Sequence, residues 1–232
     1  MDFINTHPYL IANIPLFFLI AIAVKIARPD NYRRLSLWSG LACLPCSILA
    51  LLHNERYWNP TRLGNWPIGI EDLMFSFVTG TMVWLLAAWP YRRRLSNNIL
   101  LSVCIRRALF TGLLFGGICL LLWQSGIIGL ENTLIAGTLI LLIFLLRKPA
   151  LWPFAASGVL LFLPIYVFIV KIQFAIWPDY LLQWNLTGPL GSTFLGIPIG
   201  EMVYAVVFVA VWPTYIAFVC DVRAFTVPSR PA

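Results

Sequence analysis

Three acids are the residues best suited to chemistry, and they stand at the starts of two long apolar segments. Glu71 and Asp72 are adjacent in the first half of the chain, and Glu201 lies in the second half. Desolvation in an apolar pocket penalises the anion of a carboxyl group and raises its pKa, so such a group can hold a proton at neutral pH. It can then protonate a weak base, and a second carboxylate can take a proton back. The three acids therefore predict proton-transfer chemistry at two helix starts.

A structural explanation of the same acids stays open. The first turn of a helix stabilises a negative charge, and Glu131 at the start of another apolar run needs no other role. Adjacent helical residues point about 100° apart, so we expect only one of Glu71 and Asp72 to face the interior. The remaining acids lie in loops or at ends, where we expect solvation: Asp2, Asp30, Glu55, Asp179 and Asp221.

The two acidic segments are similar to each other. Each contains a Trp-Asn pair, Trp58–Asn59 or Trp184–Asn185, followed by a loop rich in Gly and Pro and then by the acid. Glu71–Phe75 aligns with Gly200–Tyr204 without a gap. This similarity predicts two copies of one module, each with its chemistry at the same helix start.

Side chains around the acids could bind an apolar substrate. Aromatic π-faces can stabilise a carbocation, although most aromatic residues need no role beyond packing. The two asparagines either orient an acid through hydrogen bonds or simply form turns. The candidates for substrate binding are Trp58, Asn59, Trp66, Phe75, Trp184, Asn185 and Tyr204.

The sequence predicts neither a metal site nor a redox cofactor. The two histidines, His7 and His53, are far apart in the chain. Cys43 and Cys46 have the spacing of a redox pair, but they lie inside an apolar run and are expected to be small buried hydrophobes.

The composition predicts an integral membrane protein. Of the 232 residues, 60% are hydrophobic and 11% are charged, which is too apolar for the wet surface of a soluble domain of this size. Several apolar runs approach the roughly 20 residues that cross a bilayer. We therefore predict an all-α polytopic membrane bundle with seven spans, near 9–26, 37–53, 71–90, 105–123, 131–146, 151–171 and 198–220.

Basic residues indicate the topology rather than a nucleic-acid partner. All 16 Lys and Arg residues except Arg56, Arg62 and Lys171 fall on one side of the predicted bundle. Because positive charge stays cytoplasmic, we expect a multi-pass protein of the cytoplasmic membrane with its N-terminus outside and its C-terminus inside. The spans then form a 3+1+3 parallel internal repeat: a first three-helix unit (1–92), a linking helix (93–128) and a second unit (129–232).

The acidic segments also carry a family resemblance. Residues 195–204, LGIPIGEMVY, and residues 68–75, IGIEDLMF, resemble the Pro-x-Glu-Glu signature of the small membrane lycopene cyclases. These are the heterodimeric type, whose two homologous halves also occur fused in one chain, and the resemblance extends over the whole length. It implies cofactor-independent cyclisation of lycopene ends to β-rings, initiated by a proton, in an enzyme whose partners are the bilayer and a hydrophobic polyene.

The chain departs from that signature at three positions. Gly69 stands where the family has proline, Asp72 replaces the second glutamate of the first copy, and Gly200 replaces the first glutamate of the second copy. These changes fit a divergent cyclase, a cyclase of another polyprenoid, or a chain that has lost the activity. A non-catalytic seven-helix protein that binds or carries a lipid, or one with only a structural role, is the alternative from another class.

Overall fold

The computed structural model describes residues 3–223 except 54–55, 65, 97–99 and 189. Asp2, Glu55 and the basic Arg230 therefore lie outside the described residues. The elements are α1 (Phe3–Thr6), α2 (Pro8–Ile26), α3 (Asp30–Cys43), η1 (Leu44–Leu49), α4 (Ala50–His53), α5 (Ile70–Ala88), η2 (Trp89–Tyr91), α6 (Leu101–Gln124), α7 (Leu130–Arg147), η3 (Pro149–Leu151), α8 (Trp152–Ile176), η4 (Pro178–Gln183), β1 (Thr193–Phe194), β2 (Ile197–Pro198) and α9 (Ile199–Val219).

The prediction of an all-α bundle with membrane-length helices is confirmed. Within the described ranges, seven helical stretches are long and apolar enough to cross a membrane. The predicted bounds differ most in two of them. The second stretch begins at Asp30 rather than near 37, because the polar start of α3 is helical as well, and the sixth continues past Lys171 to Ile176.

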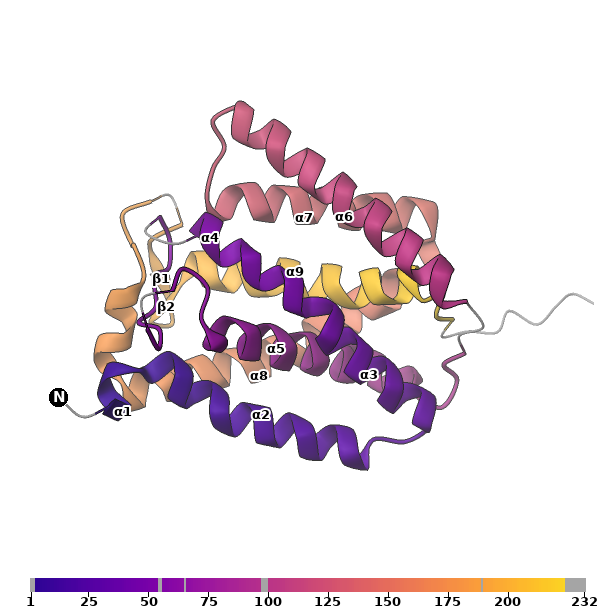
Figure 1. Cartoon of the computed structure of the whole chain (residues 1–232), viewed down its shortest axis with the longest axis horizontal. Helices are drawn as coiled ribbons and strands as arrows, with labels where there is room; N and C mark the ends of the chain where they lie inside the picture. Colours follow the sequence, from indigo (N-terminus) through magenta and orange to yellow (C-terminus); the bar gives the residue numbers. More distant parts are fainter. Residues whose placement is uncertain (1–2, 54–55, 65, 97–99, 189, 224–232) are drawn as a thin grey trace, which may run out of the picture.

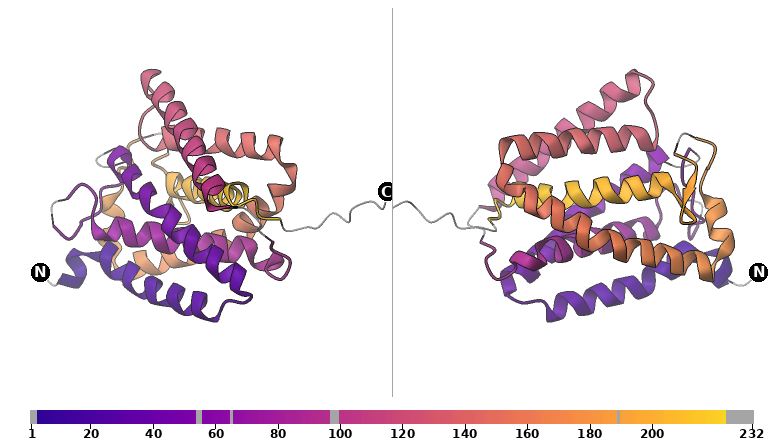
Figure 2. Two further views of the ribbon diagram at one scale, coloured as in Figure 1. Left: turned by 45° about the vertical axis from the view of Figure 1, so that its right-hand side comes forward. Right: turned by 180° about the vertical axis from the view of Figure 1, so that it is seen from behind.

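Helices α5 and α9 form the centre of the bundle (Figure 1). α5 packs against α2, α3 and α8, and α9 lies between α7 and α8 when the molecule is seen from behind (Figure 2). Helix α6 runs along the outside (Figure 1), and Thr111 is the single buried residue of this fully described helix. The central position of α5 and α9 brings the starts of both into the interior at one end.

Buried polar side chains join the central helices. Ser39 Oγ on α3 donates to the Gly80 carbonyl on α5 at 2.7 Å, and the Trp212 indole on α9 donates to Ser39 Oγ at 2.9 Å. Ser157 Oγ on α8 donates to the Ala87 carbonyl at 2.6 Å. Such bonds act as specific links between helices where apolar packing alone has little directional preference.

The second span is irregular next to the central helices. Pro45 lacks the N–H that would continue the helix and its ring crowds the preceding turn, so residues 44–49 tighten into the 3₁₀ segment η1. Cys43 and Cys46 flank this proline and are free thiols. The irregular segment forms one wall of the cavity described below.

The two ends of the bundle differ in character. One end carries α1, the loops before α5 and α9, and the small hairpin of β1 and β2 (Figure 1). The other end holds a charged cluster around Asp221, which follows α9. Its carboxylate lies 2.6 Å from Lys148, 3.5 Å from Arg107 and 3.6 Å from Arg223. The expectation that Asp221 is simply solvated is wrong, because Arg107 on α6, Lys148 after α7 and the neighbouring Arg223 converge on it.

This cluster makes a pH-dependent contribution to stability. The hydrogen bond from Lys148 lowers the pKa of Asp221 despite the partial burial of its carboxyl, and the charges of Arg107 and Arg223 lower it further. A lowered folded-state pKa adds stability that is fully present above the unfolded-state value of about 3.9 and is lost as the pH falls through the folded-state pKa.

We predict that Asp221→Asn lowers the free energy of unfolding by about 1 kcal/mol at pH 7, with the difference shrinking below about pH 4. Asparagine tolerates the positive φ of 48° at this position, so the substitution isolates the charge. Thermal unfolding in detergent across the pH range measures the effect. Asp30→Asn is the control, since its side chain is 70% exposed. Equal unfolding curves for Asp221→Asn and wild type would contradict the prediction.

Candidate active site

A cavity of about 120 Å³ lies where the starts of α5 and α9 come together. Asp72 from α5 and Glu201 from α9 both line it, although they are separated by most of the chain. Residues of α2, η1, α4 and α8 also line the cavity, and its lining extends along α5 to Met82 and along α9 to Phe208. Aromatic side chains dominate the lining: Tyr9, Tyr57, Trp58, Phe75, Phe162, Tyr166, Tyr180, Trp184, Tyr204 and Phe208.

The two Trp-Asn pairs meet at the wall of this cavity. Trp58 and Trp184 form an antiparallel backbone bridge, and their indole rings stack with centroids 5.6 Å apart. The N–H of Asn59 donates to the Gln183 carbonyl at 3.0 Å, and the N–H of Asn185 donates to the Tyr57 carbonyl at 2.7 Å. The repeated dipeptide thus joins the loop before α5 to the loop before α9.

The side chains of these pairs divide by residue type. Trp58 and Trp184 line the cavity, whereas Asn59 and Asn185 are exposed. The Asn185 amide oxygen accepts the backbone N–H of Thr187 at 3.1 Å, which is a turn-forming bond. The exposed asparagine side chains therefore do not orient the acids. Their backbone N–H groups instead form the hydrogen bonds that join the two loops.

Glu201 is held by three uncharged donors. Its Oε1 accepts the Tyr166 hydroxyl from α8, and its Oε2 accepts the Tyr57 hydroxyl at 3.4 Å and the Trp184 indole N–H at 3.1 Å. Two of these donors come from the loop region joined by the backbone bridge. The carboxyl is buried, at 9% exposure, and it faces the shared cavity.

Glycine at position 200 makes room for one of these donors. A Cβ there would lie 2.7 to 2.9 Å from the outer ring atoms and hydroxyl of Tyr57. Burial raises the pKa of Tyr57, so this phenol keeps its proton and can donate. Burial likewise raises the pKa of Tyr180, which lines the same cavity.

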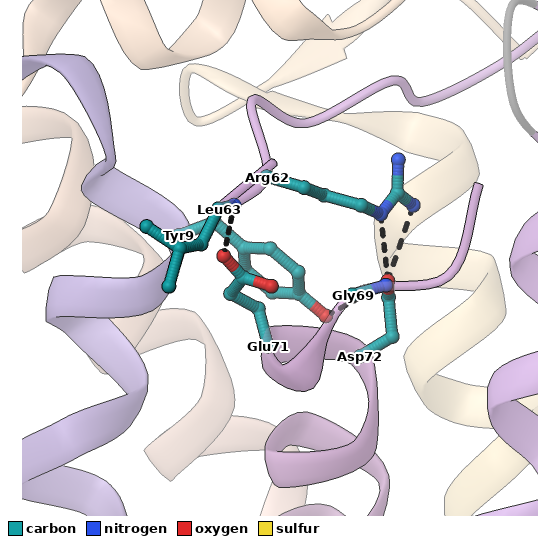
Figure 3. Close-up of polar contacts among 6 residues, drawn as sticks. All are labelled: Tyr9, Arg62, Leu63, Gly69, Glu71 and Asp72. Carbon is teal, nitrogen blue, oxygen red and sulfur yellow. Dashed lines mark hydrogen bonds and ion pairs between the residues drawn. The ribbon is translucent and has the colours of Figure 1, made fainter. Parts of the chain in front are cut away.

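Asp72 has a different environment, shown in Figure 3. Its Oδ2 accepts Arg62 Nε at 2.6 Å and the Gly69 backbone N–H at 2.7 Å. Its Oδ1 accepts Arg62 Nη2 at 3.2 Å and the Tyr9 hydroxyl at 3.4 Å. The side chains of Arg62 and Asp72 are only 5% and 3% exposed. Asp72 is therefore one half of a buried, bidentate ion pair.

Glu71 is not part of the cavity lining, and its carboxyl points to Leu63 of its own loop (Figure 3). It is fully buried, and its Oε1 accepts the backbone N–H of Leu63. Its Oε2 has no hydrogen-bond partner within the described part of the chain. A Cβ at position 69 would lie 2.2 Å from this oxygen, so glycine at that position leaves space for the carboxyl.

The remaining sequence candidates fall into two groups. Phe75 and Tyr204 line the cavity together with both tryptophans of the bridge. The expectation that Trp66 binds the substrate does not fit its position, because its side chain lies at the surface, 73% exposed and outside the cavity lining.

Sequence reasoning missed the partners of the acids. Arg62 carried one signal, since it is one of the few basic residues on the side of the acidic motifs. Tyr166 is a hydroxyl in the middle of an apolar span, which is a reason to expect a polar partner for it there. Tyr57 precedes the repeated Trp-Asn pair, but its reach across to Glu201 depends on the pairing of two distant loops.

Comparisons of the chain with models of protein families, with curated proteins and with solved structures find no match.

We predict that Gly200→Ala lowers the free energy of unfolding by about 1–3 kcal/mol, because the added methyl group overlaps the Tyr57 ring. Thermal unfolding in detergent measures the change. Gly116→Ala in α6 is the matched control, since a Cβ there meets nothing within 4 Å. A Gly200→Ala protein as stable as the control would show that Tyr57 does not need this space.

Proposed function

We propose that this chain is a membrane carotenoid cyclase that closes the ends of lycopene, or of a similar linear polyprenoid, into rings without a cofactor. The observation that carries the proposal is the shared cavity, in which carboxyl groups from two similar segments face aromatic walls inside an apolar bundle. The resemblance of residues 68–75 and 195–204 to the lycopene cyclase signature supplies the reaction.

The reaction needs a carboxylic acid that can protonate an alkene. Glu201 is the candidate, because its partners are two phenol hydroxyls and an indole N–H rather than a cation. A buried carboxylate without a counter-charge is costly, and the neutral acid avoids that cost. In the proposed reaction its proton adds to the terminal double bond, the cation closes the ring, and a proton is then lost to restore a double bond.

The aromatic walls suit the cationic stage of this reaction. The π-faces of Trp, Tyr and Phe attract positive charge, and the attraction grows when water is excluded. The Trp58 ring stacks on Trp184 and lies within 4.8 Å of the Tyr9 ring, centroid to centroid. Tyr204 and Phe208 stack farther along α9 at 5.8 Å. A cation in the cavity would thus have ring faces on more than one side.

The size of the cavity limits what it encloses. An apolar protein cavity of about 150 Å³ holds benzene, so about 120 Å³ suits one ring-sized chain end and not a whole polyene. The rest of the substrate would remain in the lipid. Each end of a symmetric polyene would then be cyclised in a separate binding event.

The two halves fit the proposal as copies of one unit, residues 1–92 and 129–232, linked by the helix in 93–128. The antiparallel bridge between Trp58 and Trp184 supports this, because equivalent residues of two related copies meet on a local two-fold axis. With positive charge on the cytoplasmic side, the end with the cavity faces outward and the N-terminus lies outside.

Expression in lycopene-accumulating cells tests the activity. We expect the wild-type chain to convert lycopene to β-carotene and Glu201→Gln to lower the conversion by about 10²–10⁴, as expected for loss of a general acid. Chromatography of the pigments measures conversion, and immunoblotting of membranes confirms equal protein levels. Glu131→Gln is the control, because Glu131 also stands in the first turn of a helix but does not line the cavity.

Absence of conversion by the wild-type chain would count against lycopene as substrate. Feeding other linear isoprenoids then separates a cyclase of another polyprenoid from a non-catalytic lipid-binding or carrier protein. Ring-closed products are expected only from a cyclase, whereas a binding protein returns the fed compound unchanged.

The stacked tryptophans provide a matched pair of substitutions. We predict that Trp184→Phe lowers the cyclisation rate about tenfold, because it removes an N–H bond to Glu201 worth about 1–2 kcal/mol. Trp58→Phe should lower it less, because the Trp58 N–H has no partner within the described residues. Initial rates of pigment formation in membranes measure both, and equal losses would show that the indole N–H of Trp184 is not needed.

A further inference from the structure

The first-half acids are engaged by their own loop. Arg62 holds Asp72 through two bonds, and the backbone N–H of Leu63 bonds to Glu71, so two consecutive loop residues bind two consecutive acids (Figure 3). Together these contacts fasten the loop to the start of α5. The same loop carries Tyr57 and Trp58, which form part of the wall around Glu201.

The Asp72 carboxylate is poorly suited to accept a proton. Both of its oxygens already accept hydrogen bonds, and the guanidinium of Arg62 is buried against them. Protonation of Asp72 would remove the negative charge that lies 2.6 Å from the buried guanidinium of Arg62, which is strongly unfavourable. The bonds and the burial of this pair therefore suit a fixed positioning role.

Glu201 has the opposite properties. The groups on its carboxyl can bond to either form of it, because a phenol hydroxyl donates to a carboxylate and accepts from a carboxylic acid. A change of charge at Glu201 therefore leaves no fixed cation unpaired.

From this asymmetry we infer that Glu201 alone both gives and recovers the proton, while Arg62 and Asp72 form a fixed ion pair that positions the loop. This inference rests on the proposed cyclase function. The Glu201 O–H proton adds to the inner carbon of the terminal double bond and leaves a tertiary cation on the outer carbon. A second double bond of the same chain attacks this cation and closes the ring, and a C–H bond next to the new cation then breaks to give the ring double bond. That proton returns to the Glu201 carboxylate, so acid and substrate balance without another proton acceptor.

A double substitution separates this role from direct catalysis by Asp72. Arg62→Met or Asp72→Asn alone removes one charge of a buried ion pair, and we expect each to lower the amount of folded protein and its activity at least tenfold. Arg62→Met with Asp72→Asn removes both charges and should recover at least one tenth of wild-type activity per folded molecule. Glu201→Gln should stay inactive in the wild-type and in the doubly substituted background.

A folded double variant as inactive as Glu201→Gln would overturn the inference, because Asp72 or Arg62 would then act in the chemistry. Should the double variant fail to fold, infrared spectroscopy of wild type and Glu201→Gln decides instead. The carbonyl stretch of a neutral carboxylic acid is expected in the wild type and should weaken in Glu201→Gln. An undiminished band would overturn the inference.

These outcomes are distinct from failure of the proposed function. A wild-type chain that converts no polyprenoid removes the cyclase proposal itself, whatever the double variant does. A wild-type chain that is active, together with an inactive but folded double variant, leaves the cyclase in place and removes only the division of roles.

Discussion

A carboxyl group inside an apolar bundle needs partners, because neither lipid nor hydrocarbon side chains can replace water around it. The three candidate acids meet this requirement in different ways. Asp72 is paired with a buried guanidinium, Glu71 accepts a backbone N–H from its own loop, and Glu201 is surrounded by uncharged hydroxyl and indole groups. Asp72 and Glu201 both line the cavity. The bonds from Arg62 to Asp72 and from Trp184 to Glu201 also fix the two loops next to the cavity.

The loops themselves are joined by backbone rather than by side chains. The bridge between Trp58 and Trp184 fixes the two indoles face to face and leaves the asparagines at the surface. This arrangement explains why a dipeptide recurs although only its first residue reaches the cavity. It also brings Tyr57, from the loop before α5, to Glu201 at the start of α9, so the partners of Glu201 come from distant parts of the chain.

The helices were largely predictable from the sequence, because runs of apolar residues long enough to cross a bilayer form helices there almost without exception. The bounds of most spans follow within a few residues. The acids and the lining aromatics Phe75 and Tyr204 could be selected because they flank the repeated motif. Arg62, Tyr166 and the cations around Asp221 could not, because their contacts join segments whose relative placement depends on the packing of the whole bundle.

The departures from the resembling signature acquire a physical reason in this packing. A side chain at position 69 would overlap the Glu71 carboxyl, and one at position 200 would occupy the place of the Tyr57 ring. Gly69 therefore leaves room for the Glu71 carboxyl, which bonds to its own loop. Gly200 leaves room for the Tyr57 phenol, which reaches Glu201. A second acid at position 200 would displace the Tyr57 donor and crowd another carboxyl against Glu201. In the proposed cyclase these changes would favour one proton-exchanging carboxyl over two equivalent ones, because Glu201 keeps its three uncharged donors.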